Sequence, residues 1–119
     1  MKKFNRETGR LGEEAAAMYL VNRGYKIIDR NFATKFGEID IVFRDGEKTV
    51  FAEVKTKIGK EFGTPEEMFT KGKLNKVKRM ATIFLKGEEI PCRIDMIAVE
   101  MDNSSQILDI RHYKNAGDR

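Results

Sequence analysis

The sequence predicts an α/β domain, in which helices pack against a central mixed β-sheet. Three observations indicate this architecture: an alanine-rich helical segment near the N-terminus, a hairpin of two alternating strands, and an amphipathic helical segment followed by a run that is apolar at both parities. The predicted order of elements is helix, three strands, helix, strand, strand. Helices that interrupt a series of strands bury their apolar stripes against the sheet, so we expect a single layered domain.

The first element is predicted as a helix over residues 6–23. Its run 15–17 is all alanine, Leu20 continues the apolar face, and Gly24 suits the left-handed residue that ends a helix. Residues 25–32 then form a predicted strand.

Residues 36–45 and 48–56 are predicted to form a β-hairpin. Both runs alternate apolar and polar side chains, and Asp45-Gly46 between them is a strong signal for a tight turn. Because side chains alternate across a strand, one set of apolar residues should share the core face. That set comprises Ile39, Ile41, Phe43, Val50, Ala52 and Val54.

A second helical segment is predicted to begin at Thr64. Thr64 can cap it, Pro65 suits its first turn, and Glu67 would complete a capping box. Gly72 is expected to interrupt or re-aim this segment, and residues 73–86 then carry an apolar stripe with helical spacing.

The last predicted elements are strands. Residues 92–100 are apolar at both parities, as in a strand that is buried on both faces. A polar turn over 102–105 leads to an edge strand over 106–113.

The size of the chain predicts one domain. With 119 residues, 40% of them hydrophobic, there is enough apolar mass for one modest core. We therefore expect residues 1–119 to form a single domain with flexible ends at 1–5 and 114–119. Lysine and arginine number 23 against 19 acidic residues, a balance that is compatible with a nucleic-acid partner but does not establish one.

Cys92 is the single cysteine, so no internal disulfide can form, and we expect it to be a small buried side chain. No apolar stretch has the length of a membrane span, and the basic N-terminus is not followed by the apolar region of a secretory signal. The sequence therefore predicts a cytoplasmic protein with no membrane partner.

Charged residues stand inside both hairpin strands, at Glu38 and Asp40 and at Glu53 and Lys55. A charge in an apolar run costs free energy unless it is solvated or paired. A two-residue turn at Asp45-Gly46 would put Glu38 opposite Glu53, whereas a four-residue loop would put Asp40 opposite Glu53. Either even-length loop places the four side chains on one face, about 4.5–8 Å apart, a span that one divalent ion can bridge, whereas a three-residue loop would split them.

Carboxylates gathered in this way repel one another, and a bound cation removes that cost. Mg²⁺ and Mn²⁺ prefer oxygen ligands, and Mg²⁺ commonly takes one or two carboxylates together with water and a substrate phosphate. Such an ion polarises the phosphate and acidifies a bound water. Lys55 would orient that water or stabilise charge in the transition state. The pattern indicates metal-dependent phosphodiester hydrolysis, with Asp40, Glu53 and Lys55 as catalytic residues and Glu38 in support.

Two simpler interpretations remain open at this point. The hairpin could lie at a sheet edge, with a solvated face that carries an ordinary cross-strand Glu–Lys pair. Glu13 shares a helix face with Ala16, Ala17 and Leu20, so it lies either at the rim of that face or in a polar site.

Several short motifs occur along the chain in a fixed order. They are Gly12-Glu13, Gly24-Tyr25, Asn31-Phe32, Gly37-Glu38-Ile39-Asp40, Glu53-Val54-Lys55-Thr56, Lys73 and Arg93-Ile94-Asp95. Together they closely resemble the YraN family, small bacterial proteins of largely undefined role that are classed with the endonucleases. That family looks like a branch of the PD-(D/E)xK nuclease superfamily, related to archaeal Holliday-junction resolvases. Ile39 stands where the superfamily's proline would precede the aspartate.

The resemblance implies a restriction-endonuclease-like fold with an αβββαβ core. It also implies that Asp40 and Glu53 bind Mg²⁺ or Mn²⁺ with the Val54 carbonyl as a third ligand, that Lys55 is the catalytic lysine, and that Glu13 is a helix-borne catalytic acid. The implied activity is an endonuclease that acts on structured or branched DNA. Because a resolvase cuts two strands symmetrically, a homodimer is expected as well.

Basic residues crowd the second helix and the loop before it, and we expect them to bind nucleic acid. They are Lys57, Lys60, Lys71, Lys73, Lys76, Lys78 and Arg79. They form either a solvated helix face or a row that contacts phosphates. Phe62 in the same loop could stack on an unpaired base, although closing the core is the favoured role. No base-reading motif is present, so recognition of DNA shape is expected rather than of sequence.

Three functions are compatible with these features. A metal-dependent endonuclease uses both the acidic set and the basic helix. A non-catalytic nucleic-acid-binding protein on the same scaffold has no need of acids where phosphates lie, and an interaction protein has no need of the basic helix. The sequence favours the endonuclease.

Overall fold

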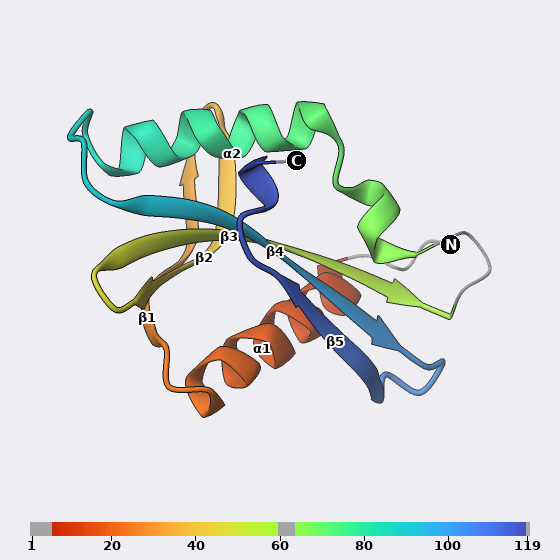
Figure 1. Cartoon of the computed structure of the whole chain (residues 1–119). Helices are drawn as coiled ribbons and strands as arrows, with labels where there is room; N and C mark the ends of the chain where they lie inside the picture. The colour runs from red at the N-terminus through yellow and green to blue at the C-terminus, as the bar shows by residue number, and fades with distance from the viewer. Residues whose placement is uncertain (1–5, 60–63, 119) are drawn as a thin grey trace.

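A five-stranded mixed sheet forms the centre of the domain, with one α-helix on each face (Figure 1). The computed structural model describes residues 6–59 and 64–118. In chain order the elements are α1 (Arg6–Asn22), β1 (Lys26–Thr34), β2 (Gly37–Asp45), β3 (Lys48–Ile58), the 3₁₀ helix η1 (Pro65–Met68), α2 (Lys71–Phe84), β4 (Cys92–Met101), β5 (Ile107–Tyr113) and the 3₁₀ helix η2 (Ala116–Asp118).

The strands lie in the order β1-β2-β3-β4-β5, and the pairs are antiparallel except for β3 with β4, which are parallel. Figure 1 shows α1 below the sheet and α2 above it. The segment η1–α2 forms the crossover that parallel neighbours require. This is the predicted α/β architecture, and it is restriction-endonuclease-like.

Two apolar clusters fill the spaces between the sheet and its helices. The α1-side cluster includes Leu20 of α1 with Phe43 and Ile97 of the sheet. The α2-side cluster includes Met80 of α2 with Val42 and Phe51. Because helices cover both faces, the sheet has no solvated side in this region, and β4 is buried at every position from Asp95 to Met101. The prediction of a strand buried on both faces is confirmed.

The side-chain alternation of β2 reverses at Asp40. Residues two apart in a strand share a face, yet Ile41 belongs to the α1-side cluster and Ile39 to the α2-side cluster. In the neighbouring strand Asn31 lies between the paired positions Arg30↔Ile41 and Phe32↔Ile39, and its φ of 56° is left-handed. The prediction that Ile39 shares a face with Ile41 and Phe43 is therefore wrong, because the chain turns over at this point.

The hairpin adopts the register that places Asp40 and Glu53 opposite each other. Asp45 pairs with Lys48, so the turn comprises Gly46 and Glu47, one residue later than predicted. The ladder continues to Ile41↔Ala52 and ends there, just before Asp40 and Glu53.

The second helix begins later than its sequence signals suggest. Thr64 precedes only the short helix η1 and makes no side-chain capping bond, so the predicted capping box does not form. Thr70 caps α2 instead, since its hydroxyl accepts a hydrogen bond from the Lys73 amide at 3.3 Å. Gly72 lies inside the first turn of α2 and does not interrupt it, which corrects the prediction.

This difference between the two threonines can be tested. Thr70→Ala should lower the free energy of unfolding by about 1 kcal/mol, because it removes an N-cap. Thr64→Ala should change it by less than about 0.5 kcal/mol. Urea denaturation of both variants measures the contrast, and equal losses would mean that Thr70 is not the effective cap.

Two further predictions concern Cys92 and the C-terminal segment 114–119. Cys92 is exposed, because β4 begins there and its buried part begins only at Asp95, so the prediction of a buried cysteine is wrong. Near the C-terminus Ala116 is buried with Met96 and Ala98. Residues 1–5 lie outside the described part of the chain.

Within residues 6–59 and 64–118, no helix is long and apolar enough to cross a membrane.

Candidate active site

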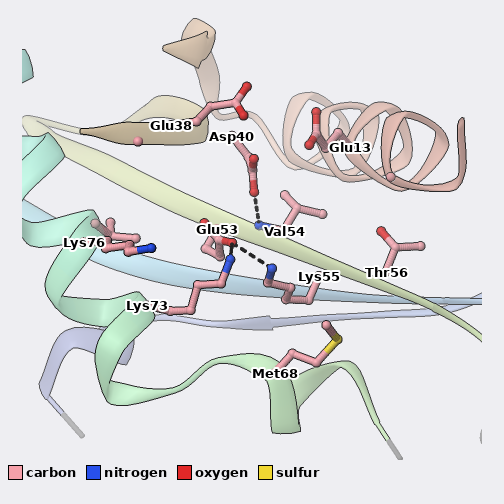
Figure 2. Close-up of a pocket in the computed structure, with 13 residues that line it drawn as sticks. Glu13, Glu38, Asp40, Glu53, Val54, Lys55, Thr56, Met68, Lys73 and Lys76 are labelled. Atoms are coloured by element: carbon pink, nitrogen blue, oxygen red, sulfur yellow. Dashed lines mark hydrogen bonds and ion pairs between the residues drawn. The ribbon is translucent and has the colours of Figure 1, made fainter. Parts of the chain in front are cut away.

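A pocket of about 450 Å³ lies where α1, the β2–β3 hairpin and α2 meet (Figure 2). Glu13 of α1 and Glu38 of β2 line one side, and Lys73 and Lys76 reach in from α2 on the other, with β3 between them. The pocket thus brings together most of the residues that the sequence singles out: Glu13, Glu38, Asp40, Glu53, Val54, Lys55, Lys73 and Lys76.

Asp40 is held at the point where strands β2 and β3 separate. Its Oδ2 accepts a hydrogen bond from the Val54 amide at 2.8 Å. This contact lies just beyond the last paired residues of the two strands, so the carboxylate takes the place of a main-chain partner for Val54. Asp40 is only 9% exposed, and one of its oxygens is committed to this bond.

Glu53 lies beside Asp40 and is compensated by two lysines. Its Oε2 is 3.2 Å from Lys55 Nζ and 3.5 Å from Lys73 Nζ. The Lys55 side chain is 16% exposed and that of Lys73 is 41% exposed, so Lys73 is the more accessible cation. The interpretation as a solvated edge hairpin is wrong, because β2 and β3 are interior strands and both acids are buried.

The placement of Glu13 depends on a close crossing of α1 over β3. At Gly12 a Cβ atom would lie 1.8 Å from Thr56 Oγ1, so only glycine allows the helix to pack this near. The next residue, Glu13, therefore reaches the pocket wall, where its Oε1 accepts a hydrogen bond from Asn31 Nδ2 at 3.0 Å. Of the two positions left open by the sequence, the polar site is the one observed.

Burial and neighbouring groups shift the pKa values of three side chains in the pocket, Asp40, Lys55 and Lys73. Burial, together with the nearby carboxylates of Glu53 and Glu13, raises the pKa of Asp40 to about 8, and the Val54 amide offsets only part of this. Burial and the adjacent Lys73 lower the pKa of Lys55, against the effect of Glu53. Strongly shifted groups in one cavity are typical of functional sites.

The raised pKa of Asp40 predicts a pH-dependent stability. The folded protein binds the Asp40 proton more tightly than the unfolded chain does. The contribution of this proton to the free energy of unfolding is therefore complete below the ordinary pKa of 3.8 and is lost as the pH rises towards about 8. At pH 7.5 without divalent metal, Asp40→Asn should raise the free energy of unfolding by about 2–4 kcal/mol, while at pH 4 it should differ little from wild type. Denaturant titrations at the two pH values measure this, and a stabilisation that is the same at both would contradict it.

Not every predicted binding residue lies in the pocket. Of the basic set, Lys57, Lys71, Lys78 and Arg79 do not line it, and Lys60 and Phe62 lie outside the described residues. Among the described residues, Met68 also lines it, and Asn31 orients Glu13. The sequence could have pointed to Asn31, because it lies inside a predicted strand and Asn is disfavoured in strands.

Asp95 of the Arg93-Ile94-Asp95 motif does not line the pocket, and its contacts are structural. It is fully buried, accepts hydrogen bonds from Arg93 Nε at 2.8 Å and from the Asn115 amide at 3.1 Å, and lies 2.7 Å from His112 Nε2. Through His112 and Asn115, these contacts hold the C-terminal segment against β4.

The donor set suits a hard divalent cation of the Mg²⁺ type. Among the residues that the structure describes, no three histidine, cysteine, aspartate or glutamate side chains are grouped so that they alone could hold a metal ion. Mg²⁺ needs fewer, since it commonly binds one or two carboxylates and fills its remaining positions with water and substrate phosphate. Asp40 and Glu53 meet that requirement. Burial is the main cause of the raised pKa of Asp40, and the repulsion by Glu53 that adds to it is the kind that a cation relieves.

The fold and pocket define an α/β domain with a buried acidic pair and one lysine on its central hairpin and a second lysine that reaches in from α2. The chain belongs to the uncharacterised protein family UPF0102, whose family model matches residues 12–99. This is the YraN-type family that the motifs resemble, and the match includes Glu13, Asp40, Glu53 and Lys55.

Relatives in this family align over almost their whole length. A UPF0102 protein of Syntrophomonas wolfei is 44% identical over 118 residues, which cover 95% of this chain and 99% of the relative. A UPF0102 protein of Caldicellulosiruptor saccharolyticus is 41% identical over 114 residues, which cover 93% of this chain and 97% of the relative.

Proposed function

We propose that this protein is a metal-dependent endonuclease of the PD-(D/E)xK type that hydrolyses phosphodiester bonds in structured or branched DNA in the cytoplasm. The observation that carries the proposal is the convergence of Asp40, Glu53 and Lys55 on one pocket. An acidic pair that would bind a cation, with a lysine adjacent to it, supplies the charges that metal-dependent hydrolysis of a phosphodiester uses.

Asp40 and Glu53 would hold Mg²⁺ or Mn²⁺, with the Val54 carbonyl as the third protein ligand that the resemblance implies. When bound, the ion supplies charge that polarises the phosphate and acidifies a water. Lys55 stabilises negative charge as it develops on the phosphate, since its ammonium is held within 3.2 Å of Glu53 and largely out of solvent.

Glu13 and Lys73 complete the proposed site from the two helices. Glu13 orients the attacking water from the α1 side, because its carboxylate lies near Asp40 and is held by Asn31. Lys73 and Lys76 contact the substrate phosphates from the α2 side, since both line the pocket. Lys71, Lys78 and Arg79 extend this contact along the exposed surface of α2.

The decisive experiment incubates the protein with branched, flapped and linear DNA, with and without Mn²⁺ or Mg²⁺. The proposal expects cleavage that needs the metal and is lost in Asp40→Ala. Binding to DNA without metal-dependent cleavage would support the non-catalytic nucleic-acid-binding protein instead, and the absence of both would exclude any role on DNA.

Metal binding can be measured without activity. Mg²⁺ or Mn²⁺ at pH 7.5 should raise the melting temperature of the wild type, because a ligand that binds only the folded state stabilises it. Asp40→Asn should lose most of that increase. A metal-induced increase that is equal in both proteins would show that the ion binds elsewhere.

Cutting two strands symmetrically requires two sites, so the resolvase-like form of the proposal includes a homodimer. Light scattering with and without DNA tests this separately. A monomer under both conditions would exclude resolvase action while leaving a nicking endonuclease.

A further inference from the structure

An exposed aromatic residue immediately precedes two residues that line the pocket. Phe36 lies in the two-residue turn between β1 and β2, immediately before Gly37 and Glu38, which line the pocket. It is 42% exposed, although burial of an aromatic side chain normally stabilises a protein. In the described part of the chain Tyr113 is also exposed, at 36%, but its hydroxyl is bonded to Glu66, so it has a structural partner.

Two cations lie close to the ring. The guanidinium carbon of Arg79 lies 4.0 Å from the ring centroid, and Lys35 Nζ lies 5.3 Å from it. Figure 1 shows the β1–β2 turn in orange rising behind α2, and the contact with Arg79 joins the two elements. A second contact fixes the base of the turn, where the Thr34 hydroxyl donates to Met80 Sδ at 3.3 Å.

Arg79 continues a row of cations that begins in the pocket. Lys73, Lys76 and Arg79 follow one another at intervals of three residues on α2. Lys73 is 3.5 Å from Glu53, Lys76 lines the pocket, and Arg79 contacts Phe36. A phosphate backbone that follows this row from the pocket reaches an aromatic ring, and that combination is typical of single-strand binding.

We infer that Phe36 and Arg79 form a stacking platform for an unpaired base of a DNA strand whose phosphates follow Lys76 and Lys73 into the pocket. The inference rests on the proposed function and specifies its substrate class, a duplex with an unpaired strand beside the cleavage site. Stacking selects an unpaired base without reading its identity, because every base has a π face and a paired base is already stacked.

The test compares two flapped DNAs that carry the same number of phosphates. In one the unpaired strand is oligothymidylate, and in the other it consists of abasic nucleotides. Binding is measured by fluorescence anisotropy in EDTA, so that no cleavage occurs. Wild type should bind the oligothymidylate flap about tenfold more tightly, which is the effect expected from stacking of one base.

Three variants separate the stacking of a base on Phe36 from the effect of an apolar side chain at this position and from the loss of any exposed apolar side chain. Phe36→Leu keeps an apolar side chain under Arg79 but should lose the tenfold difference between the two flaps, and Phe36→Trp should keep it. Ile107→Ala is the matched control, because Ile107 is also 42% exposed but does not line the pocket. Binding of the linear duplex should be unchanged in all three variants.

Two results would overturn the inference. One is a Phe36→Leu variant that still binds the oligothymidylate flap tenfold more tightly than the abasic flap. The other is a variant that weakens binding to both flaps and to the duplex equally, which would indicate a purely structural role for the turn. Base-dependent binding without cleavage in Mn²⁺ would retain the inference and remove the endonuclease, whereas cleavage without base-dependent binding would do the reverse.

Discussion

Lys55→Met is expected to lower the rate of metal-dependent DNA cleavage by about 10²–10³-fold with little effect on folding. In the proposed mechanism the rate falls because the variant lacks the ammonium that would stabilise charge on the phosphate in the transition state, and loss of one such group costs about this factor. The fold is retained because Lys73 remains 3.5 Å from Glu53, so the buried carboxylate still has a cation beside it. The methionine also keeps most of the apolar stem. Single-turnover rates in Mn²⁺, with melting temperatures as a check on folding, measure the effect.

Two matched variants show whether the effect belongs to the site. Lys48 stands on the same strand, is exposed and does not line the pocket, so Lys48→Met should cleave like the wild type. Lys73→Met should weaken DNA binding more than it lowers the rate at saturating DNA, because Lys73 is 41% exposed and contacts substrate phosphates in the proposed site. A Lys55→Met variant that cleaves at the wild-type rate would remove Lys55 from the mechanism.

The alternation and turn signals of the hairpin predicted which strands meet at the site. They did so because the period of a strand fixes which residues can share a face, and both registers that were open placed Glu53 opposite an acid. The choice between them depended on a turn one residue later than Asp45-Gly46, which pairs Asp45 with Lys48. A one-residue difference of this kind lies within the ambiguity of turn sequences, since glycine suits either central position of a two-residue hairpin turn, the second in Asp45-Gly46 and the first in Gly46-Glu47.

The burial of the acids could not be predicted from the sequence. Solvent exposure of a strand face depends on whether a helix covers it, and the crossover that puts α2 on the face of Glu53 and Lys55 is a tertiary feature. The reversal of side-chain alternation at Asn31 and Asp40 also could not be predicted from the sequence. It combines a left-handed residue in β1 with the end of the β2–β3 pairing. Local propensity likewise misplaced the helix start at Thr64, where a cap signal precedes only a short 3₁₀ turn.

The crossing of α1 over β3 predicts the largest loss of stability on substitution. Gly12→Ala should lower the free energy of unfolding by about 2–3 kcal/mol, because the added methyl group would lie 1.8 Å from Thr56 Oγ1 and 2.9 Å from Thr56 Cβ, and overpacking of this kind forces a backbone shift. Gly9→Ala is the matched control on the same helix. Nothing lies within 4 Å of the Cβ that it would add, so it should stabilise the protein by about 0.5–1 kcal/mol through helix propensity. Urea denaturation of both variants gives the two values.

The same substitution connects stability to the site, because Gly12 sets how near Glu13 comes to Asp40. In Gly12→Ala the helix has to move away from β3, so the effect of Glu13 on the pKa of Asp40 should weaken together with cleavage. Thr56→Ala in that background removes the nearest atom, Oγ1, and should restore part of the lost stability while Thr56 Cβ still limits the approach. A Gly12→Ala variant as stable as wild type would show that α1 can shift without cost, and the close crossing would then not be what holds Glu13 at the pocket.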